Sequence, residues 1–153
     1  MIYLNKKGRE FIGSVKEDVK ISQNTLHSLL RNEVYIYLKC PIDWEMEHLY
    51  EKEVTPPNRY GISFGDMNIS HKKRVICDAV YKRNGYVYLI EIDNERKMVD
   101  NKKKIEAYRE IMPWITDVAP ILCFYTKTEN RKRKLKEWLV GVRHEVKTFE
   151  EIK

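Results

Sequence analysis

Two runs of mostly apolar residues surround an Asn-Gly dipeptide near the middle of the chain. The runs span residues 75–83 and 86–93, with the dipeptide at residues 84–85. Runs of this length and composition are typical of strands, and Asn-Gly is the preferred pair of a two-residue type I′ hairpin turn. The pattern predicts an antiparallel hairpin, and counting outward from the turn places Asp78 opposite Glu91.

The rest of the chain alternates between helix-like and strand-like segments. Apolar residues three or four positions apart predict helices at 23–33, 95–112 and 129–142, and apolar or β-branched runs predict strands at 34–38, 119–126 and 145–149. Residues 45–70 contain two prolines and little periodicity, which indicates a loop-rich segment with a short strand at its start. The expected order is helix, about three antiparallel strands, helix, strand, helix, strand.

Length and composition narrow the class of protein. The chain has 153 residues, of which 42% are hydrophobic, enough for the core of one domain. We find no apolar run long enough for a membrane span and no apolar N-terminal segment, so we expect a soluble cytoplasmic protein without membrane contact. Cys40, Cys77 and Cys123 lack metal-site spacing and are expected to be reduced core thiols, with a zinc site or disulfide as the less favoured alternative.

The charge balance favours an anionic partner. Lys and Arg number 29 against 23 Asp and Glu, giving a net charge of +6, with basic clusters at residues 71–74, 101–104 and 130–136. The alternative is that these clusters are solvated faces of helices. The candidate DNA-binding residues are Lys72, Lys73, Arg74, Lys102, Lys103, Arg131, Lys132 and Arg133.

The predicted hairpin carries three carboxylates among its apolar residues. Its register places Asp78, Glu91 and Asp93 on one face. Directly opposed like charges destabilise a sheet, and a divalent cation such as Mg²⁺ or Mn²⁺ would remove that repulsion. The alternatives are a shared proton, a pairing lysine, or a different register that leaves three solvated acids.

A lysine is available on the helix that follows the hairpin. In the predicted helix 95–112, Lys102 and Lys104 flank the apolar stripe centred on Ile105. Lys104 lies one turn before Tyr108 on the same side, so we favour it as the residue that reaches back to the carboxylates. A lysine there can orient or deprotonate a water molecule and stabilise negative charge, whereas the alternative is an ordinary surface lysine.

These motifs resemble those of the PD-(D/E)xK nuclease superfamily: an acid on one hairpin strand, Glu-x-acid on the next, and a helical lysine. The resemblance implies a restriction-endonuclease-like α/β fold with a mixed central sheet flanked by helices. It also implies Mg²⁺ bound by Asp78, Glu91 and Asp93, and Lys104 as an aid to phosphodiester hydrolysis. Two departures are Cys77 in place of the motif's proline, and Asp93 where the lysine normally stands.

A longer resemblance is to the replication-relaxation family of plasmids and other mobile elements. It runs through YLNKKGREFIG, LHSLLRNEVYIYL, CDAV, IEID and KIEAYRE in that order. It implies that residues 1–13 are the end of a winged helix-turn-helix and a linker, followed by a nuclease-like domain at 14–153. DNA, and with it other replication proteins, would be the partners.

Two residues, His27 in the first helical segment and Glu33 at its end, match the same pattern and would approach the carboxylates from the other side. The interpretation that we favour is nevertheless that His27 is a hydrogen-bonded structural histidine and Glu33 is part of the helix end. The functional expectation is a Mg²⁺-dependent endodeoxyribonuclease. The alternative is a catalytically inactive nuclease-fold module for DNA binding or assembly of a replication complex.

Overall fold

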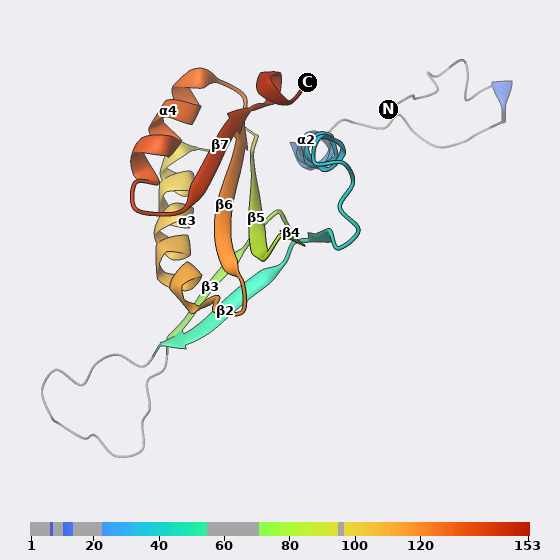
Figure 1. Cartoon of the computed structure of the whole chain (residues 1–153). Coiled ribbons are helices and arrows are strands. Elements are labelled where there is room, and N and C mark those ends of the chain that lie inside the picture. The colour runs from blue at the N-terminus through green and yellow to red at the C-terminus, as the bar shows by residue number, and fades with distance from the viewer. Residues whose placement is uncertain (1–6, 8–10, 14–22, 55–70, 95–96) are drawn as a thin grey trace, which may run out of the picture.

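The computed structural model describes residues 7, 11–13, 23–54, 71–94 and 97–153. Over these residues the protein is mixed α/β, with a five-stranded mixed sheet between helices (Figure 1). The predicted end of a winged helix-turn-helix, at residues 1–13, falls almost entirely outside the described residues. No described helix has both the length and the apolar character that a membrane crossing requires.

The central sheet has the strand order β1-β4-β5-β6-β7. Its three antiparallel strands are β1 (Glu45–Met46), β4 (Ala79–Arg83) and β5 (Tyr86–Asp93), and β6 (Ala119–Thr126) and β7 (His144–Thr148) continue it in parallel with β5. The prediction of a mixed sheet is confirmed. Because β4 runs antiparallel to β5, the start of β4 and the end of β5 lie side by side, at the same end of the strands.

The hairpin of β4 and β5 has the register that the sequence predicts. Arg83 pairs with Tyr86, and the ladder continues outward to the pair Ala79 and Ile90. Asn84 and Gly85 have φ angles of 53° and 78°, as a type I′ turn requires of both central residues. The Asn-Gly signal therefore determined both the turn and the pairing.

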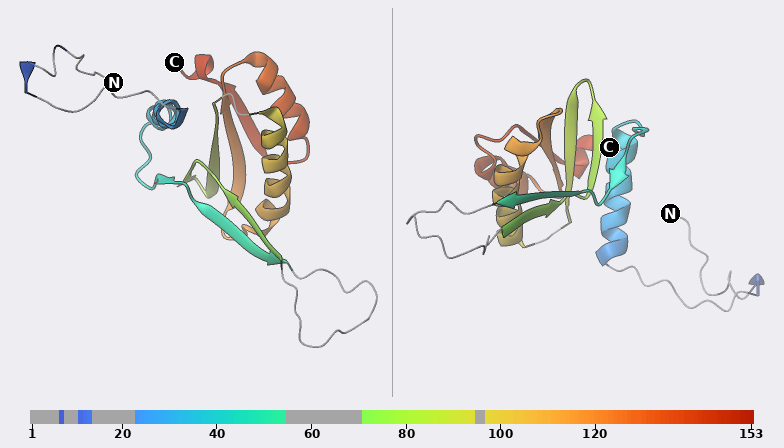
Figure 2. Two further views of the ribbon diagram at one scale, coloured as in Figure 1. Left: turned by 180° about the vertical axis from the view of Figure 1, so that it is seen from behind. Right: turned by 90° about the horizontal axis from the view of Figure 1, so that it is seen from below.

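Helices cover both faces of the sheet. The helices α3 (Met98–Ile111) and α4 (Glu129–Trp138) pack on one face, and α2 (Gln23–Tyr37) lies on the other (Figure 2). Each face has its own apolar cluster, which includes Leu89, Ile105 and Leu135 on the α3 side and Val34, Ile90 and Tyr125 on the α2 side. Two short 3-10 helices, η1 (Met112–Trp114) and η2 (Phe149–Ile152), follow α3 and β7.

The end and the start of the two packed helices follow local signals. Pro113 lies in η1, directly after α3, where a proline cannot continue the α-helical hydrogen-bond pattern. The helix α4 begins after Thr128, whose side-chain oxygen accepts a hydrogen bond from the backbone N–H of Arg131. Leu135 and Leu139 are fully buried, as the predicted inward stripe of this segment requires.

The prediction of a strand at residues 34–38 is wrong, because α2 continues to Tyr37. The β-branched and aromatic residues of this run favour a strand by propensity, but the packing of one helical face decides the outcome. Val34 is fully buried against the sheet, whereas Ile36, two positions later, is exposed. A two-residue period would have placed both side chains on the same face.

The first strand of the predicted hairpin is in fact two strands in different sheets. Residues His71–Ile76 form β3, which pairs with β2 (Leu49–Val54) in a separate two-stranded sheet that extends away from the central one (Figure 1). The chain then turns at Cys77 and Asp78 before β4 begins. Ile76, an apolar residue of the predicted hairpin run, is 52% exposed as a result.

All three cysteines are free thiols. Cys77 and Cys123 are buried, as predicted, but Cys40 is exposed, so the expectation that it is a core thiol is wrong. Cys40 follows α2 with a positive φ of 52°, in the turn after the helix, where no strand forms around it.

Candidate functional site

The carboxylates of the hairpin gather at one end of the central strands, where β5 ends and β4 begins. Glu91 and Asp93 lie near the carboxyl end of β5, and Asp78 lies just before the start of the antiparallel strand β4. The paired ladder ends at Ala79 and Ile90, so Asp78 bends away from the regular position opposite Glu91. Its backbone N–H donates to the carbonyl of Ile90 over 3.0 Å, which keeps it close to β5.

Glu91 is held by two side chains of α3. Its side chain is 2% exposed, the Nζ atom of Lys104 lies 2.6 Å from its Oε2 atom, and the hydroxyl of Tyr108 donates to its Oε1 atom. The predicted reach of Lys104 toward the carboxylates is therefore confirmed. Lys104 and Tyr108 are four residues apart, so one helical face supplies both contacts.

Asp78 is held from the opposite face of the sheet. Its Oδ2 atom accepts a hydrogen bond of 2.7 Å from the backbone N–H of Ile92, and its Oδ1 atom lies 3.3 Å from Nε2 of His27 on α2. The expected approach of His27 is thus present in the structure. Glu33 does not share it, because its side chain is exposed and its electrostatic partner is Lys153 at the C-terminus.

The two carboxylates differ in how readily they ionise. Burial, followed by the negative charge of Asp78, raises the pKa of Glu91 to about 8, although Lys104 and Tyr108 oppose the shift. Burial also acts to raise the pKa of Asp78, but His27, Lys104 and the Ile92 N–H outweigh it and lower that pKa. Near neutral pH the pair therefore holds a proton that two separate carboxylates would not.

This arrangement is suited to a divalent cation. The two carboxylates share a largely buried end of the sheet, where burial and then the negative charge of Asp78 favour the protonated form of Glu91, and a cation would replace that proton. The described residues contain no group of three or more His, Cys, Asp or Glu side chains placed to bind a metal. A site here would therefore have Asp78 and Glu91 as protein ligands with water completing the coordination, which is the pattern that Mg²⁺ accepts.

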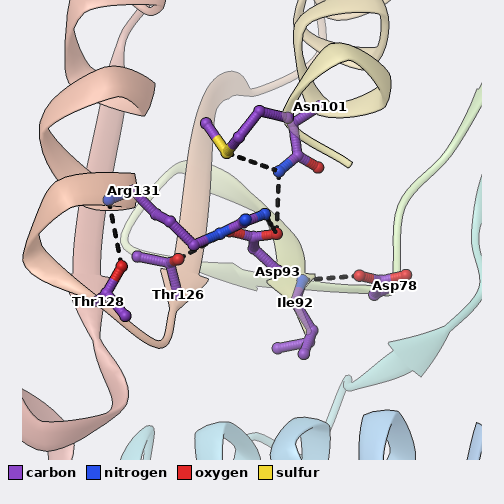
Figure 3. A network of polar contacts seen from close by, with 8 residues as sticks. Asp78, Ile92, Asp93, Asn101, Thr126, Thr128 and Arg131 are labelled. Atoms are coloured by element: carbon purple, nitrogen blue, oxygen red, sulfur yellow. Dashed lines mark hydrogen bonds and ion pairs between the residues drawn. The ribbon is translucent and has the colours of Figure 1, made fainter. Parts of the chain in front are cut away.

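Asp93 belongs to a separate buried network (Figure 3). Arg131 of α4 donates to both of its carboxylate oxygens over 2.6 Å, from Nε and Nη2, in a two-pronged ion pair. Asn101 of α3 and Thr126 of β6 donate to the same carboxylate over 2.9 and 2.7 Å. This differs from the expected role of Asp93 as a third metal ligand, because its oxygens already accept four hydrogen bonds.

The network changes the interpretation of Arg131 as well. We expected Arg131 to bind DNA phosphate, but its guanidinium joins α4 to the end of β5, and Asn101 does the same for the start of α3. The ion pair thus fixes the first turn of α4 at the end of β5, and the hydrogen bond from Asn101 fixes the first turn of α3 there. The helix that carries Lys104 is therefore positioned by the contact between Asn101 and Asp93.

The other candidate DNA-binding residues are spread over several elements. Lys72 and Lys73 of β3 form ion pairs with Glu51 and Glu110, and Lys132 of α4 with Glu129 and Glu151. Among these candidates, the exposed side chains to which the described residues supply no ion pair are those of Arg74, Lys102, Lys103 and Arg133. The structure does not gather all eight into one patch.

Sequence reasoning missed two residues of the site. From the sequence, Tyr108 was used only to mark the helix side on which Lys104 lies, although that same spacing indicated that both side chains could reach Glu91. Arg31 of α2 gave no signal at all, yet it is buried and lies four residues after His27. Burial of an arginine depends on the packing of α2 on the sheet, which composition and periodicity do not reveal.

We compared the chain with protein-family models, with curated proteins and with solved structures, and none of the three comparisons gave a match.

Proposed function

We propose that the protein is a metal-dependent phosphodiester hydrolase with a restriction-endonuclease-like fold that nicks or cuts DNA. The observation that carries the proposal is the group formed by Asp78, Glu91 and Lys104 where β5 ends and β4 begins. Two carboxylates with unequal pKa values and a lysine 2.6 Å from one of them supply the ligands and the positive charge that such hydrolysis needs.

Each residue has a separate role in the proposed reaction. Asp78 and Glu91 would hold Mg²⁺ or Mn²⁺, which when bound supplies a positive charge that polarises a phosphoryl oxygen. Lys104 orients the attacking water and stabilises the charge that develops on the phosphate. Water forms a new bond to phosphorus and gives up a proton, one P–O bond to a sugar oxygen breaks, and the leaving oxygen takes up a proton, so that no net proton is gained or lost.

The surrounding residues keep these groups in place. Tyr108 fixes the orientation of Glu91 by donating to its second oxygen. Asp93 acts as a positioning residue, because the hydrogen bond from Asn101 holds the start of α3 against the sheet and the ion pair with Arg131 holds the start of α4. The lysine that usually occupies the position of Asp93 in related nuclease motifs would then be replaced by Lys104 from the helix.

The biological setting that we propose is replication or maintenance of a plasmid or other mobile element. It rests on the resemblance of the chain's motifs to those of the replication-relaxation family, and the net charge of +6 is compatible with DNA as the partner. Replication proteins would be further partners in that setting.

A second candidate is a catalytically inactive module of the same fold that binds DNA or assembles a replication complex. One observation favours it: Asp93 stands at the position of the usual strand lysine and is fully engaged by Arg131, Asn101 and Thr126. If Lys104 serves only to neutralise Glu91, the protein retains basic side chains that can bind DNA but does not hydrolyse it.

The test combines metal binding and DNA cleavage in the same samples. Mg²⁺ and Mn²⁺ are titrated by calorimetry into wild type, Asp78→Asn, Glu91→Gln and the control Glu137→Gln, which changes an exposed residue of α4. Nicking of supercoiled plasmid is then followed. We expect Asp78→Asn and Glu91→Gln to lose both metal binding and plasmid nicking, and Glu137→Gln to keep both.

Other results would decide against the enzyme. Nicking that persists in both variants would overturn the assignment of the site. Absence of metal binding and nicking in wild type, together with retained DNA binding, would favour the inactive module.

A further inference from the structure

Arg31 of α2 is a buried charge that lacks a good partner. It is 9% exposed, and its Nε atom is one of two buried side-chain nitrogen or oxygen atoms without a hydrogen bond among the described residues. Its Nη1 atom lies 3.6 Å from Oε1 of Glu47, which is longer than a hydrogen bond. The Glu47 side chain is 76% exposed, so solvent weakens this ion pair.

The other described charged residues of the buried class are well compensated. Glu91 has Lys104 and Tyr108, and Asp93 accepts four hydrogen bonds. Burying a charge without a strong partner is costly, because the water that solvated it is lost. Arg31 is therefore the buried charge that would gain most from an additional anionic partner.

Arg31 also lies beside the candidate site. It follows His27 by four residues on α2, so both side chains share the helical face that meets Asp78. Glu47, its weak partner, donates its backbone N–H to the carbonyl of Asp78 over 3.2 Å. Both links between Arg31 and Asp78 are indirect, because one runs along α2 through His27 and the other runs through Glu47 to the backbone of Asp78.

We infer that Arg31 binds a backbone phosphate of the DNA substrate at the Asp78 and Glu91 site, and that Glu47 occupies this guanidinium until DNA displaces it. The inference rests on the proposed function for the identity of the substrate. A planar guanidinium matches the geometry of a phosphate and can donate two hydrogen bonds to it. An exposed carboxylate held at 3.6 Å is readily exchanged for a phosphate, which accepts shorter bonds.

The same arrangement gives α2 a function in substrate binding. A phosphate held by Arg31 would lie on the α2 side of the sheet, the side from which His27 approaches Asp78. Arg31 is in this sense a substrate-binding residue, and it would contribute to the affinity for DNA as well as to the orientation of the bound phosphate.

The experiment measures binding of a fluorescein-labelled DNA duplex of about 20 base pairs by anisotropy, in Ca²⁺ and in EDTA, over a range of salt. The proteins are wild type, Arg31→Gln and Arg83→Gln, the last removing the same charge from the exposed hairpin turn at the far end of β4. We expect Arg31→Gln to weaken binding roughly tenfold or more, and to reduce the salt slope by about 0.9, while Arg83→Gln changes binding little.

A second pair of variants leaves Arg31 in place. Glu47→Gln removes the competing carboxylate and should tighten DNA binding roughly threefold, whereas Glu137→Gln, an equal charge change on α4, should have a smaller effect. Thermal unfolding of each variant establishes that it is folded. If Arg31→Gln fails to fold, the comparison of Glu47→Gln with Glu137→Gln decides the matter.

The outcomes separate this inference from the proposed chemistry. Equal binding by Arg31→Gln and Arg83→Gln, or no gain from Glu47→Gln over its control, overturns the role of Arg31 whether or not the protein cleaves DNA. A selective loss in Arg31→Gln without cleavage by wild type supports the phosphate site and counts against the hydrolase. Absence of DNA binding by wild type at low salt overturns both.

Discussion

The Nζ atom of Lys104 lies 2.6 Å from Oε2 of Glu91, although one residue is on α3 and the other is at the centre of the buried sheet. The side chain of Lys104 is 15% exposed and that of Glu91 is 2% exposed. The lysine therefore reaches from the helix surface to a carboxylate that solvent hardly touches. A cation that binds Glu91 would compete with Lys104 and release its ammonium group toward a substrate.

Replacement of Lys104 tests this role directly. Lys104→Gln should lower the rate of plasmid nicking on the order of 100-fold or more, because the charge that stabilises the transition state is lost. The fold should persist, since Glu91 can stay protonated when its partner is removed. Lys82→Gln changes an exposed lysine of β4 and should nick at nearly the wild-type rate. Equal rates for the two variants would contradict the role of Lys104.

The raised pKa of Glu91 makes stability depend on pH. The pKa moves from an ordinary value of 4.5 to about 8 in the folded state, so the folded state binds more protons than the unfolded state between these values. The free energy of unfolding should therefore be highest below pH 4.5, as far as this group contributes, and fall as pH rises through 8. The decrease should be on the order of a few kcal/mol.

Urea unfolding between pH 5 and 9 measures this decrease. Glu91→Gln cannot ionise, so its stability should vary much less over the window than that of wild type or of Glu137→Gln. Parallel curves for all three proteins would show that Glu91 is not the titrating group. Mg²⁺ should also stabilise wild type more at pH 8 than at pH 5, because it binds the ionised pair.

The part of the site that lies in the hairpin was accessible from the sequence. Asn84-Gly85 fixes the turn, and the turn fixes which residues of β4 and β5 are opposed. Side chains alternate along β5, so Glu91 and Asp93 share a face. The helical period then brings Lys104 to the same side. These steps depend on local geometry, so they needed no knowledge of the rest of the fold.

Other parts depend on contacts between distant segments and could not be predicted in this way. An apolar run does not reveal where a strand leaves one sheet and joins another, as happens between Ile76 and Ala79. Arg131 stands in a basic cluster that resembles any exposed helix face, and only the packing of α4 brings it to Asp93. Propensity likewise favoured a strand at Val34, where tertiary packing selects a helix.

The cysteines provide a test of the fold that is independent of activity. Cys40 is exposed, whereas Cys77 and Cys123 are buried, and burial raises the pKa of both buried thiols, to about 12 for Cys77. A thiol reagent at pH 8 should therefore modify one cysteine in the native protein and all three in urea. Mass spectrometry of digested samples identifies the modified residue. Rapid native modification of Cys77 would contradict the packing of the sheet edge beside Asp78.

Asp93→Asn distinguishes an anchoring residue from a metal ligand. The variant leaves the guanidinium of Arg131 partly buried without a carboxylate, which should lower the free energy of unfolding by about 3 to 5 kcal/mol in urea. Asp78 and Glu91 remain intact, so calorimetry on the folded variant should give a Mg²⁺ affinity close to that of wild type. Asp78→Asn provides the contrast, because it should lose metal binding at little cost in stability. If Asp93→Asn instead lost metal binding as completely as Asp78→Asn does, Asp93 would be a ligand and its network with Arg131 would have to open when the metal binds.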